Sequence, residues 1–301
     1  MAHSTARLLL IIAATLGTSV ALAAHRTYDN RLNAPPGGRL TFEADVGSVT
    51  VVGSDARYIV VHADLRASES FLSDFHISAE QTQSGVTISA RKSHDGWFHW
   101  FGFGSSRVQF TVEVPRDYPV YLQTAGGDLT VRDLNASVRA GTSGGNASVQ
   151  NVAGTIDLHT SGGSIDAQHL NGSSKLSTSG GGIDVADSTG DLDLRTSGGS
   201  IRLQNDDGRI DAHTSGGNIR AELRANRGIN LSTSGGNITV MLPQDTRASV
   251  DAETSGGRVS SDFTLSTTQI TDSEHLRGAI GGGGPPIDLH TSGGDVRLVP
   301  R

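Results

Sequence analysis

Hydrophobic and polar residues alternate along most of this chain, in short segments on either side of a recurring Thr-Ser-Gly-Gly tetrapeptide. Such alternation is typical of β-strands that bury one face, because successive side chains of a strand point to opposite sides. Glycine reaches positive φ without a Cβ penalty, so the Gly pair suits a corner between two strands. The tetrapeptide begins at Thr142, Thr160, Thr178, Thr196, Thr214, Thr233, Thr254 and Thr291, and a Thr-Ala-Gly-Gly variant begins at Thr124.

The spacing of the tetrapeptides predicts a solenoid. Starts from 124 to 214 follow at intervals of 18 residues, and the next intervals are 19, 21 and 37. We interpret the longest interval as two units with one degenerate copy between them. A constant period lets each strand lie on its counterpart in the next unit, with rungs about 4.8 Å apart. The expected fold is therefore all-β, a single-stranded parallel β-helix with rungs of about 18 residues over residues 120–301.

Four aligned columns supply the core of this solenoid. They hold Val, Ile, Leu or Ala in nearly every copy, as at Leu122, Leu158, Ile183, Ile201 and Ile219. The Thr of each tetrapeptide continues the inward series, so we expect its hydroxyl to bond to the backbone or to neighbouring Thr side chains. A second corner of the unit often carries Gly, at Gly154, Gly172, Gly190 and Gly208. Eight copies of a Ser-containing motif indicate architecture, because a catalytic nucleophile is needed once and beside a base.

The N-terminal third is an irregular version of the same pattern. Residues 40–51 resemble residues 120–131, and Gly47 stands where Gly127 stands. Residues 75–90 and 107–115 alternate over longer stretches and predict longer strands. We therefore predict an irregular N-terminal β cap over residues 24–119, which would close one end of the solenoid.

Residues 1–23 have the three parts of a secretory signal peptide. Arg7 precedes an apolar run that begins at Leu8, and small residues precede a cleavage point before Ala24. The apolar run is short for a membrane span. The chain has no Cys, so we expect no lipid anchor. These features predict an exported protein, periplasmic or secreted, and not a lipoprotein.

Composition narrows the possible classes further. The chain has 301 residues, 39 Gly and only 5% aromatic residues, which disfavours an ordinary packed α/β core. A disulfide framework is excluded by the lack of Cys. The net charge is −7 with acids and bases interspersed, so no basic stripe is present to bind nucleic acid.

The N-terminal cap followed by Thr-Ser-Gly-Gly-x-Ile-x-Val copies resembles the DUF4097 family of adhesin-like β-strand repeat proteins. Head domains of autotransporter adhesins are similar. The resemblance covers residues 38–299. It implies a parallel β-helix at the cell envelope with a structural or interaction role, and it brings no catalytic motif to carry over.

An aromatic segment within the cap, residues 96–104, is the sharpest departure from the repeat pattern. It contains both tryptophans of the chain and three of its eight phenylalanines: Trp97, Phe98, Trp100, Phe101 and Phe103. Such a glycine-flanked loop can stack on sugar rings, enter a membrane interface or bind a protein partner. It can equally fold over the solenoid end as an apolar plug. The sequence leaves both roles open, and with them the choice among an envelope glycan, a membrane surface and a protein.

A second candidate site is a charged patch on the outward face before the tetrapeptide. Asp193, Arg195, Asp211 and His213 fall on neighbouring rungs and are expected within a few ångström of one another. Parallel β-helices can carry polysaccharide-cleaving sites on such faces, with paired carboxylates or a basic proton acceptor. The alternative function is therefore a carbohydrate-active enzyme. An ordinary ladder of exposed ion pairs explains the same residues, and we favour a non-enzymatic protein.

No motif predicts a metal or a cofactor. His-Glu-x-x-His, Cys pairs and the calcium-binding nonapeptide are absent from the sequence. Asp206 and Asp207 precede Gly208 at a corner, where we expect a solvated turn. The sequence does not decide the oligomeric state.

Overall fold

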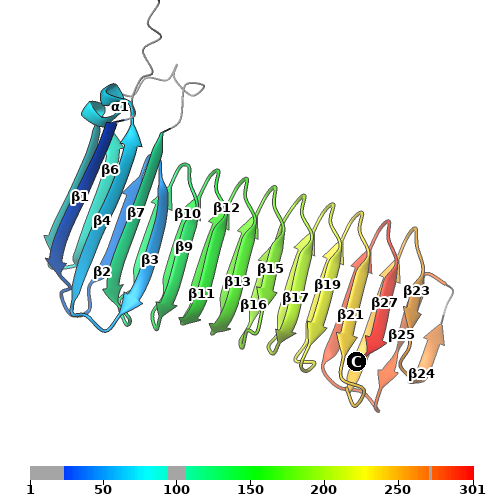
Figure 1. The fold of residues 1–301 in the computed structure, drawn as a ribbon. Coiled ribbons are helices and arrows are strands. Elements are labelled where there is room, and N and C mark those ends of the chain that lie inside the picture. The colour runs from blue at the N-terminus through cyan, green and yellow to red at the C-terminus, as the bar shows by residue number, and fades with distance from the viewer. Residues whose placement is uncertain (1–23, 94–105, 271–272) are drawn as a thin grey trace, which may run out of the picture.

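The computed structural model describes residues 24–93, 106–270 and 273–301. Two long sheets face each other along a rod (Figure 1), with 13 strands in sheet A and 14 in sheet B. The inward aliphatic side chains of both sheets form one continuous core. The predicted all-β solenoid is confirmed.

Each regular rung gives one strand to each sheet, with the Ser-Gly-Gly corner between them. The strands that precede the corner belong to sheet B; they are β8 (Val120–Thr124), β10 (Val138–Thr142), β12 (Ile156–Thr160), β14 (Ser174–Thr178), β16 (Leu192–Arg195), β18 (Ile210–Thr214) and β20 (Ile229–Thr233). The strands that follow the corner belong to sheet A; they are β9 (Leu129–Leu134), β11 (Ala147–Ala153), β13 (Ile165–Asn171), β15 (Ile183–Ala186), β17 (Ile201–Asp206), β19 (Ile219–Leu223) and β21 (Ile238–Leu242). Successive rungs pair in parallel.

The register follows the sequence columns. Ile183 is the partner of Ile165 on one side and of Ile201 on the other, and its side chain is fully buried. Because side chains alternate faces along a strand, this register puts every aliphatic column inside at once. The predicted inward columns are therefore confirmed.

The corners are held by the Thr side chains. Thr160 Oγ1 donates to the carbonyl oxygen of Gly145 in the preceding rung at 2.7 Å and accepts from the backbone N–H of Gly163 at 3.3 Å. The same donation to the preceding rung recurs at Thr142, Thr178, Thr196, Thr214, Thr233, Thr254 and Thr291. Of the two partners expected for these hydroxyls, the backbone is the one observed.

The second Gly of the tetrapeptide is required for a reason that the sequence argument did not give. Gly127 in the first rung has a positive φ, but from Gly145 to Gly236 the φ of this glycine lies outside the left-handed region, so positive φ is the wrong explanation there. A Cβ added to Gly163 would lie only 2.1 Å from the carbonyl oxygen of Gly145. Close stacking of corner on corner therefore excludes any side chain at this position.

At the opposite corner three of the four predicted glycines adopt positive φ, namely Gly154, Gly172 and Gly190, whereas Gly208 does not. A second left-handed column precedes them in five successive rungs, at Asp133, Asn151, His169, Asp187 and Asn205, with φ between 53° and 62°. Asn, Asp and His tolerate this region better than other side chains do. These residues shift the alternation within the strand, so that the next residue, such as Val152 after Asn151, is buried as well.

The N-terminal end is covered by longer strands. They are β1 (Ala24–Asn33), β2 (Arg39–Ala44), β3 (Ser48–Ser54), β4 (Tyr58–Ala67), β5 (Phe75–Thr82), β6 (Gly85–Lys92) and β7 (Arg107–Pro115), with a short helix α1 (Glu69–Asp74). The rung β2–β3 lies between β8–β9 and β6–β7, and all of these pairs are parallel. Outside them β4, β1 and β5 pair antiparallel. The long strands overhang the first corners of the rod (Figure 1).

The C-terminal end does not follow chain order. It consists of β22 (Ala248–Thr254), β23 (Val259–Ser261), β24 (Leu265–Ile270), β25 (His275–Ile280), β26 (Pro286–Thr291) and β27 (Val296–Pro300). The last rung, β26–β27, lies between β20–β21 and β22–β23. The strands β24 and β25 form an antiparallel hairpin on β22. The degenerate copy inferred from the 37-residue interval is therefore wrong, because that interval holds the hairpin.

Candidate functional site

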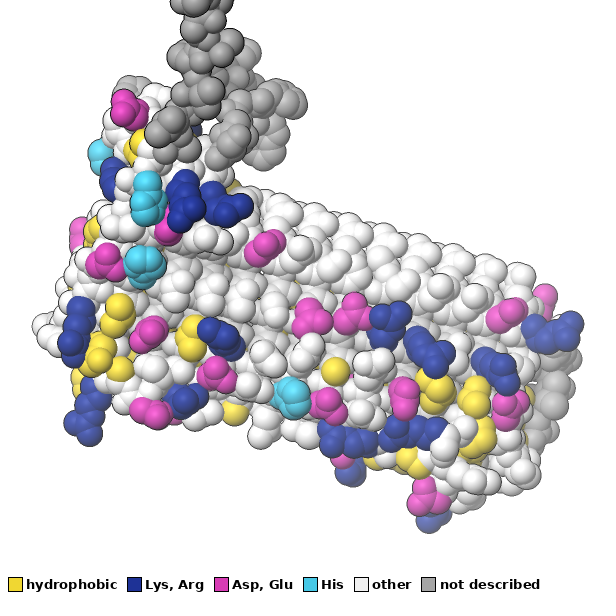
Figure 2. Space-filling model, in the orientation of Figure 1, with side chains coloured by type: hydrophobic (Ala, Val, Ile, Leu, Met, Phe, Trp, Pro, Cys, Tyr) yellow, Lys and Arg dark blue, Asp and Glu magenta, His cyan; other side chains and the backbone are white. Residues whose placement is uncertain are grey.

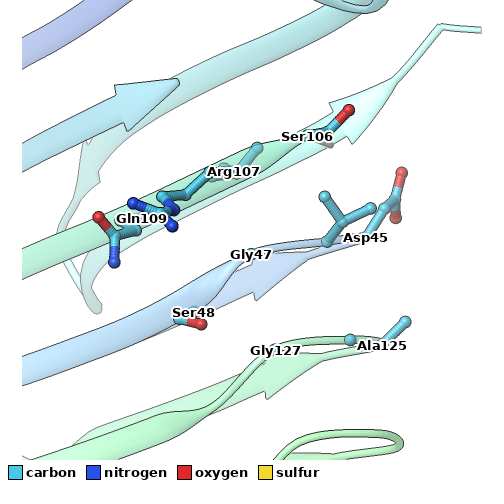
Figure 3. A pocket seen from close by; sticks show the side chains of 11 residues that line it. Asp45, Gly47, Ser48, Ser106, Arg107, Gln109, Ala125 and Gly127 are labelled. Atoms are coloured by element: carbon cyan, nitrogen blue, oxygen red, sulfur yellow. The ribbon is translucent and has the colours of Figure 1, made fainter. Parts of the chain in front are cut away.

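A notch opens where the overhanging cap meets the first corners of the rod. It has a volume of about 450 Å³ and is lined by residues 45–48, 106–109 and 125–127. These three segments come from the corner before β3, the start of β7 and the corner before β9 (Figure 3). The notch therefore exists because β7 continues past the level at which the rungs turn.

Glycines form the floor of the notch. Gly47 and Gly127 both have positive φ, and the N–H of Gly47 donates to the carbonyl oxygen of Gly126 at 2.8 Å. A Cβ at Gly47 would lie 2.9 Å from the Val108 side chain, so a larger residue would press on the wall of the notch. The floor thus has backbone and no side chain at its lowest point.

The walls combine aliphatic and hydrogen-bonding side chains. Val46 and Val108 supply the apolar part, whereas Asp45, Arg107 and Gln109 are exposed at the rim. Figure 3 shows Asp45 at one end of the notch and Gln109 toward the other. The backbone N–H of Lys92 donates to Asp45 Oδ2 at 2.9 Å, which fixes that carboxylate. The rim therefore offers an acid, a guanidinium and an amide around an aliphatic wall.

Charged and histidine side chains gather on the outer face of the cap next to the notch (Figure 2). His25 Nε2 lies 3.2 Å from Asp64 Oδ2, and Arg66 Nε lies 3.3 Å from Asp64 Oδ1. Burial acts to raise the pKa of Asp64, but the hydrogen bond with His25 and the Arg66 charge outweigh it and hold that pKa below its usual value. Arg66 is also the cross-strand partner of Arg107. This cluster makes the cap side of the notch polar, whereas the Ser-Gly-Gly corners beyond it form a band almost free of charge on the face seen in Figure 2.

The predicted charged patch lies on the outward face of β16 and β18. Asp193 is the partner of Asp211, and Arg195 is the partner of His213. Each acid is paired within its own strand, with Arg195 Nε 2.9 Å from Asp193 Oδ1 and His213 Nε2 2.8 Å from Asp211 Oδ1. The structure thus brings all four residues together, as two half-buried acid–base pairs on the outward face of neighbouring strands.

The aromatic residues predicted to bind a ligand, Trp97, Phe98, Trp100, Phe101 and Phe103, lie outside the described residues. Their role as binding site or plug stays a prediction. Among the described residues, no group of three or more His, Cys, Asp or Glu side chains could hold a metal ion. Within the same ranges no helix is long and apolar enough to cross a membrane.

Asp206 departs from the expected solvated turn. Its side chain occupies an inward column and is 1% exposed, with Oδ1 accepting from the backbone N–H of Ser188 at 2.9 Å. Burial raises its pKa to about 7, against the opposing effects of Ser188, Gln204 and the Arg224 charge. The prediction was wrong because β17 continues through Asp206, which therefore turns inward where earlier rungs carry Leu134, Val152 and Leu170.

The notch has no signature in the sequence that predicts it as a site. Its rim residues Asp45, Arg107 and Gln109 have no motif, and Arg107 is about 60 positions from Asp45 in the chain. One signal was available, since Gly47 matches Gly127 in the repeat alignment and the two corners do stack. What the alignment could not supply is the parallel pairing of β3 with β7, which puts Gln109 beside Ser48.

Comparison with known proteins places the chain in a family. The model of the family described as Toastrack DUF4097 matches residues 38–299. No protein of curated function matches the sequence. A crystal structure of a candidate adhesin from Bacteroides fragilis aligns over 91% of this chain and 97% of its own, with 13% identity and a TM-score of 0.43. A candidate cell adhesion protein from Clostridium sporogenes aligns over 92% and 100%, with 12% identity and a TM-score of 0.25.

The two structural similarities are too low in TM-score to support a conclusion about this chain. The family match stands on its own, because it spans most of the cap, the notch and nearly the whole rod. It also agrees with the resemblance that the Thr-Ser-Gly-Gly copies indicate. The chain therefore belongs to the Toastrack DUF4097 family.

Proposed function

We propose that this chain is an exported, non-enzymatic, adhesin-like protein of the cell envelope, which binds an envelope glycan in the notch. The notch itself is the observation that carries the proposal. Ligand sites are typically concave, of about 300–1,000 Å³, with apolar walls and a few polar groups that set orientation. The notch has this size, with Val46 and Val108 on its walls and Arg107, Gln109 and Asp45 at its rim.

A glycan suits this combination better than a wholly apolar or a highly charged ligand does. Sugar rings present C–H faces that pack on aliphatic walls and hydroxyl groups that hydrogen-bond to amide, carboxylate and guanidinium groups. The rod supports the same proposal, because its paired backbone would hold the notch at one end of a stiff body. Export rests on the expected signal peptide in residues 1–23, and it stays a prediction.

Retention on fractionated cell envelope tests the proposal. The protein would be passed over peptidoglycan, outer-membrane vesicles and immobilised soluble glycans, beside the double variant Arg107→Ala/Gln109→Ala. The matched control is Thr111→Ala/Glu113→Ala, which removes outward side chains further along the same strand β7. We expect a glycan fraction to retain the parent and the control but not the notch variant. Equal retention of all three, or none, would contradict a glycan site in the notch.

The aromatic segment enters the same assay as a separate variant. Trp97→Ala/Trp100→Ala, checked for unchanged unfolding, would lose retention if these residues bind the glycan as well. If the tryptophan variant is retained as well as the parent, the aromatic segment does not bind the glycan, and its role would be that of an apolar plug over the solenoid end. Retention by vesicles alone, lost in the tryptophan variant, would replace the glycan with a membrane surface.

The carbohydrate-active enzyme remains the second candidate, because Asp193 and Asp211 put two carboxylates on neighbouring strands. Each is already paired with a base on its own strand, as an exposed ion-pair ladder requires. Release of soluble sugars from envelope glycans by the parent, abolished in Asp193→Ala, would favour the enzyme. We expect no release from either protein.

A further inference from the structure

Both sheets of the rod end in a long edge strand at the cap. Sheet A ends at β1, which has ten residues, and sheet B ends at β5, which has eight (Figure 1). Within the described residues neither strand has a further strand on its outer side. We propose that two copies of this chain join end to end here, with β1 pairing with β1 of the second copy and β5 with β5, both antiparallel. The proposal does not depend on a ligand in the notch.

The backbone of β1 offers hydrogen-bonding groups to a further strand. The N–H of Ala34, just after β1, donates to the carbonyl oxygen of Arg57 on the β4 side, whereas the N–H of Asn33 donates to the side chain of Gln81 on β5. Because these groups alternate in direction along a strand, the odd residues of β1 turn their N–H and C=O to the open edge. Such an edge is a template for pairing.

The backbone of β5 offers the same groups. Thr82 and Gly85 flank the two-residue turn of the β5–β6 hairpin, so they are a hydrogen-bonded pair of that hairpin. The even residues of β5 therefore bond to β6, and the odd residues, among them Ile77 and Ala79, turn their N–H and C=O to the open edge.

The side chains of β1 match those of a second, antiparallel β1. With Asn30 opposite Asn30 of the second copy, Asp29 lies opposite Arg31 and Tyr28 opposite Leu32, twice each. Asp29 and Arg31 are exposed on the outer face, and opposite charges in facing positions stabilise a strand pair. A shift by two residues in either direction would put Asp29 or Arg31 opposite its own copy. Charge therefore selects the pairing about Asn30.

The side chains of β5 match in the same way about Ser78. With Ser78 opposite Ser78 of the second copy, His76 lies opposite Glu80 and Ile77 opposite Ala79, twice each. His76 and Glu80 are exposed on the outer face, and neither forms an ion pair with another described residue. The pairing about Ser78 supplies an acid–base partner to both.

A single two-fold axis can serve both edges. The Arg26 guanidinium donates to the carbonyl oxygen of Phe75 at 2.7 Å, and the N–H of Asn33 donates to Gln81 Oε1 at 3.2 Å. These two contacts show that β1 and β5 run side by side in the same direction across the end of the core. The centre of each match lies about halfway between the two contacts on its strand. An axis through one centre therefore passes close to the other, as a closed dimer requires.

The same pairing would cover the end of the core. Tyr28, Leu32, Ile77 and Ala79 pack against the core but are only partly buried. In the dimer each of them faces an apolar side chain of the second copy, so the core of one rod continues into the core of the other. Removal of this apolar surface from water favours association.

The opposite end of the rod does not offer comparable edges. There sheet A ends at β23, which has three residues, and sheet B ends at β24, whose register with β25 shifts between Ser266 and Gln269. Short and irregular edge strands disfavour pairing with another chain. Association at the cap therefore closes on a two-fold axis as a dimer and does not extend into a filament.

Exchange of charge on β1 tests the pairing in the full chain. Asp29→Arg sets two arginines opposite each other, and Arg31→Asp sets two aspartates opposite each other. Each variant alone should therefore associate at least about tenfold more weakly than the parent. An equimolar mixture of the two variants restores an acid opposite a base at both positions. Sedimentation over a concentration series should show a dimer for the parent and for the mixture. The matched control is Arg132→Asp, an exposed residue of β9 on the body of the rod, which should keep the parent's mass.

Single cysteines locate the axis, because the chain has no Cys of its own. Asn30→Cys and Ser78→Cys each set a cysteine opposite its own copy, in a pair with Cα atoms about 4.5 Å apart, which a disulfide can join. The matched control is Thr27→Cys on the same strand, which would lie about 20 Å from its copy. After oxidation we expect linked dimers of the first two variants, and not of the control, on a non-reducing gel.

Four results would overturn the proposal. They are a monomer mass for the parent at every concentration, and failure of the mixture to recover the dimer when both charge variants unfold like the parent. The other two are a disulfide at only one of the two axial positions, and linkage of Thr27→Cys equal to that of Asn30→Cys and Ser78→Cys.

Discussion

Replacement of Asp206 by Asn should flatten the pH dependence of stability. Asp206 is buried, and its pKa is about 7 in the folded protein against an ordinary value of 3.8. The unfolded chain therefore releases this proton at lower pH than the folded chain does, so the contribution of Asp206 to stability is fully present below pH 3.8 and is lost as pH rises through about 7. At 1.36 kcal/mol per pKa unit the whole interval corresponds to about 4 kcal/mol, of which about 2–3 kcal/mol falls between pH 5 and pH 8.

Thermal or urea unfolding at pH 5 and pH 8, followed by circular dichroism, measures this effect. Asp206→Asn keeps the side-chain oxygen that accepts from the N–H of Ser188 but cannot ionise. Between pH 5 and pH 8 the free energy of unfolding should therefore decrease less in this variant than in the parent, by about 2–3 kcal/mol. The control is Asp207→Asn, which removes an exposed acid paired with Arg227 and should keep the parent's pH response. Equal pH dependence in the parent and in Asp206→Asn would refute the inward, neutral carboxyl.

Three further predictions concern stability and use the same unfolding assay. Thr196→Val keeps the shape but leaves the half-buried carbonyl of Gly181 without its hydroxyl partner, so it should cost about 1–3 kcal/mol, whereas Thr196→Ser should cost less. Gly199→Ala puts a Cβ 2.1 Å from the Gly181 carbonyl oxygen and should destabilise more than Gly216→Ala, whose Cβ meets nothing closer than 3.5 Å; equal effects would contradict the stacked corner. Arg202→Ala removes an exposed ion pair with Asp184 and should change stability by less than about 1 kcal/mol.

The regular rod could be predicted because local pattern and global fold agree in it. Ile165, Ile183 and Ile201 stand 18 residues apart, and strand pairing at that interval buries all three. A slip of one residue would turn each of them to solvent, so the hydrophobic pattern alone selects the register. The left-handed column of Asp187 and Asn205 escaped the same reasoning, because polar residues beside a corner suit several turn geometries.

The order of the last rungs could not be predicted, because two segments have the same pattern and either could pair with β20–β21. Thr254 and Thr291 begin the same tetrapeptide, and Val250 and Ile287 occupy the same column. The side-chain pattern alone would allow either segment to pair with β20 in sheet B. The choice depends on connections instead. Residues 243–247 span the inserted rung, and the hairpin β24–β25 pairs with the outer side of β22, so β26–β27 lies between β20–β21 and β22–β23.

The notch escaped prediction for a related reason, which bears on where function lies in a repeat protein. Regular rungs present the same corner again and again, so the Ser-Gly-Gly band carries no single distinguished position. A concave site needs a break in that regularity, and β7 provides it by continuing beyond the level of the corners. The break depends on strand length and on the pairing of residues far apart in sequence, such as Ser48 with Gln109. The repeat pattern therefore predicts the body of the rod but not the notch between the cap and the first corners.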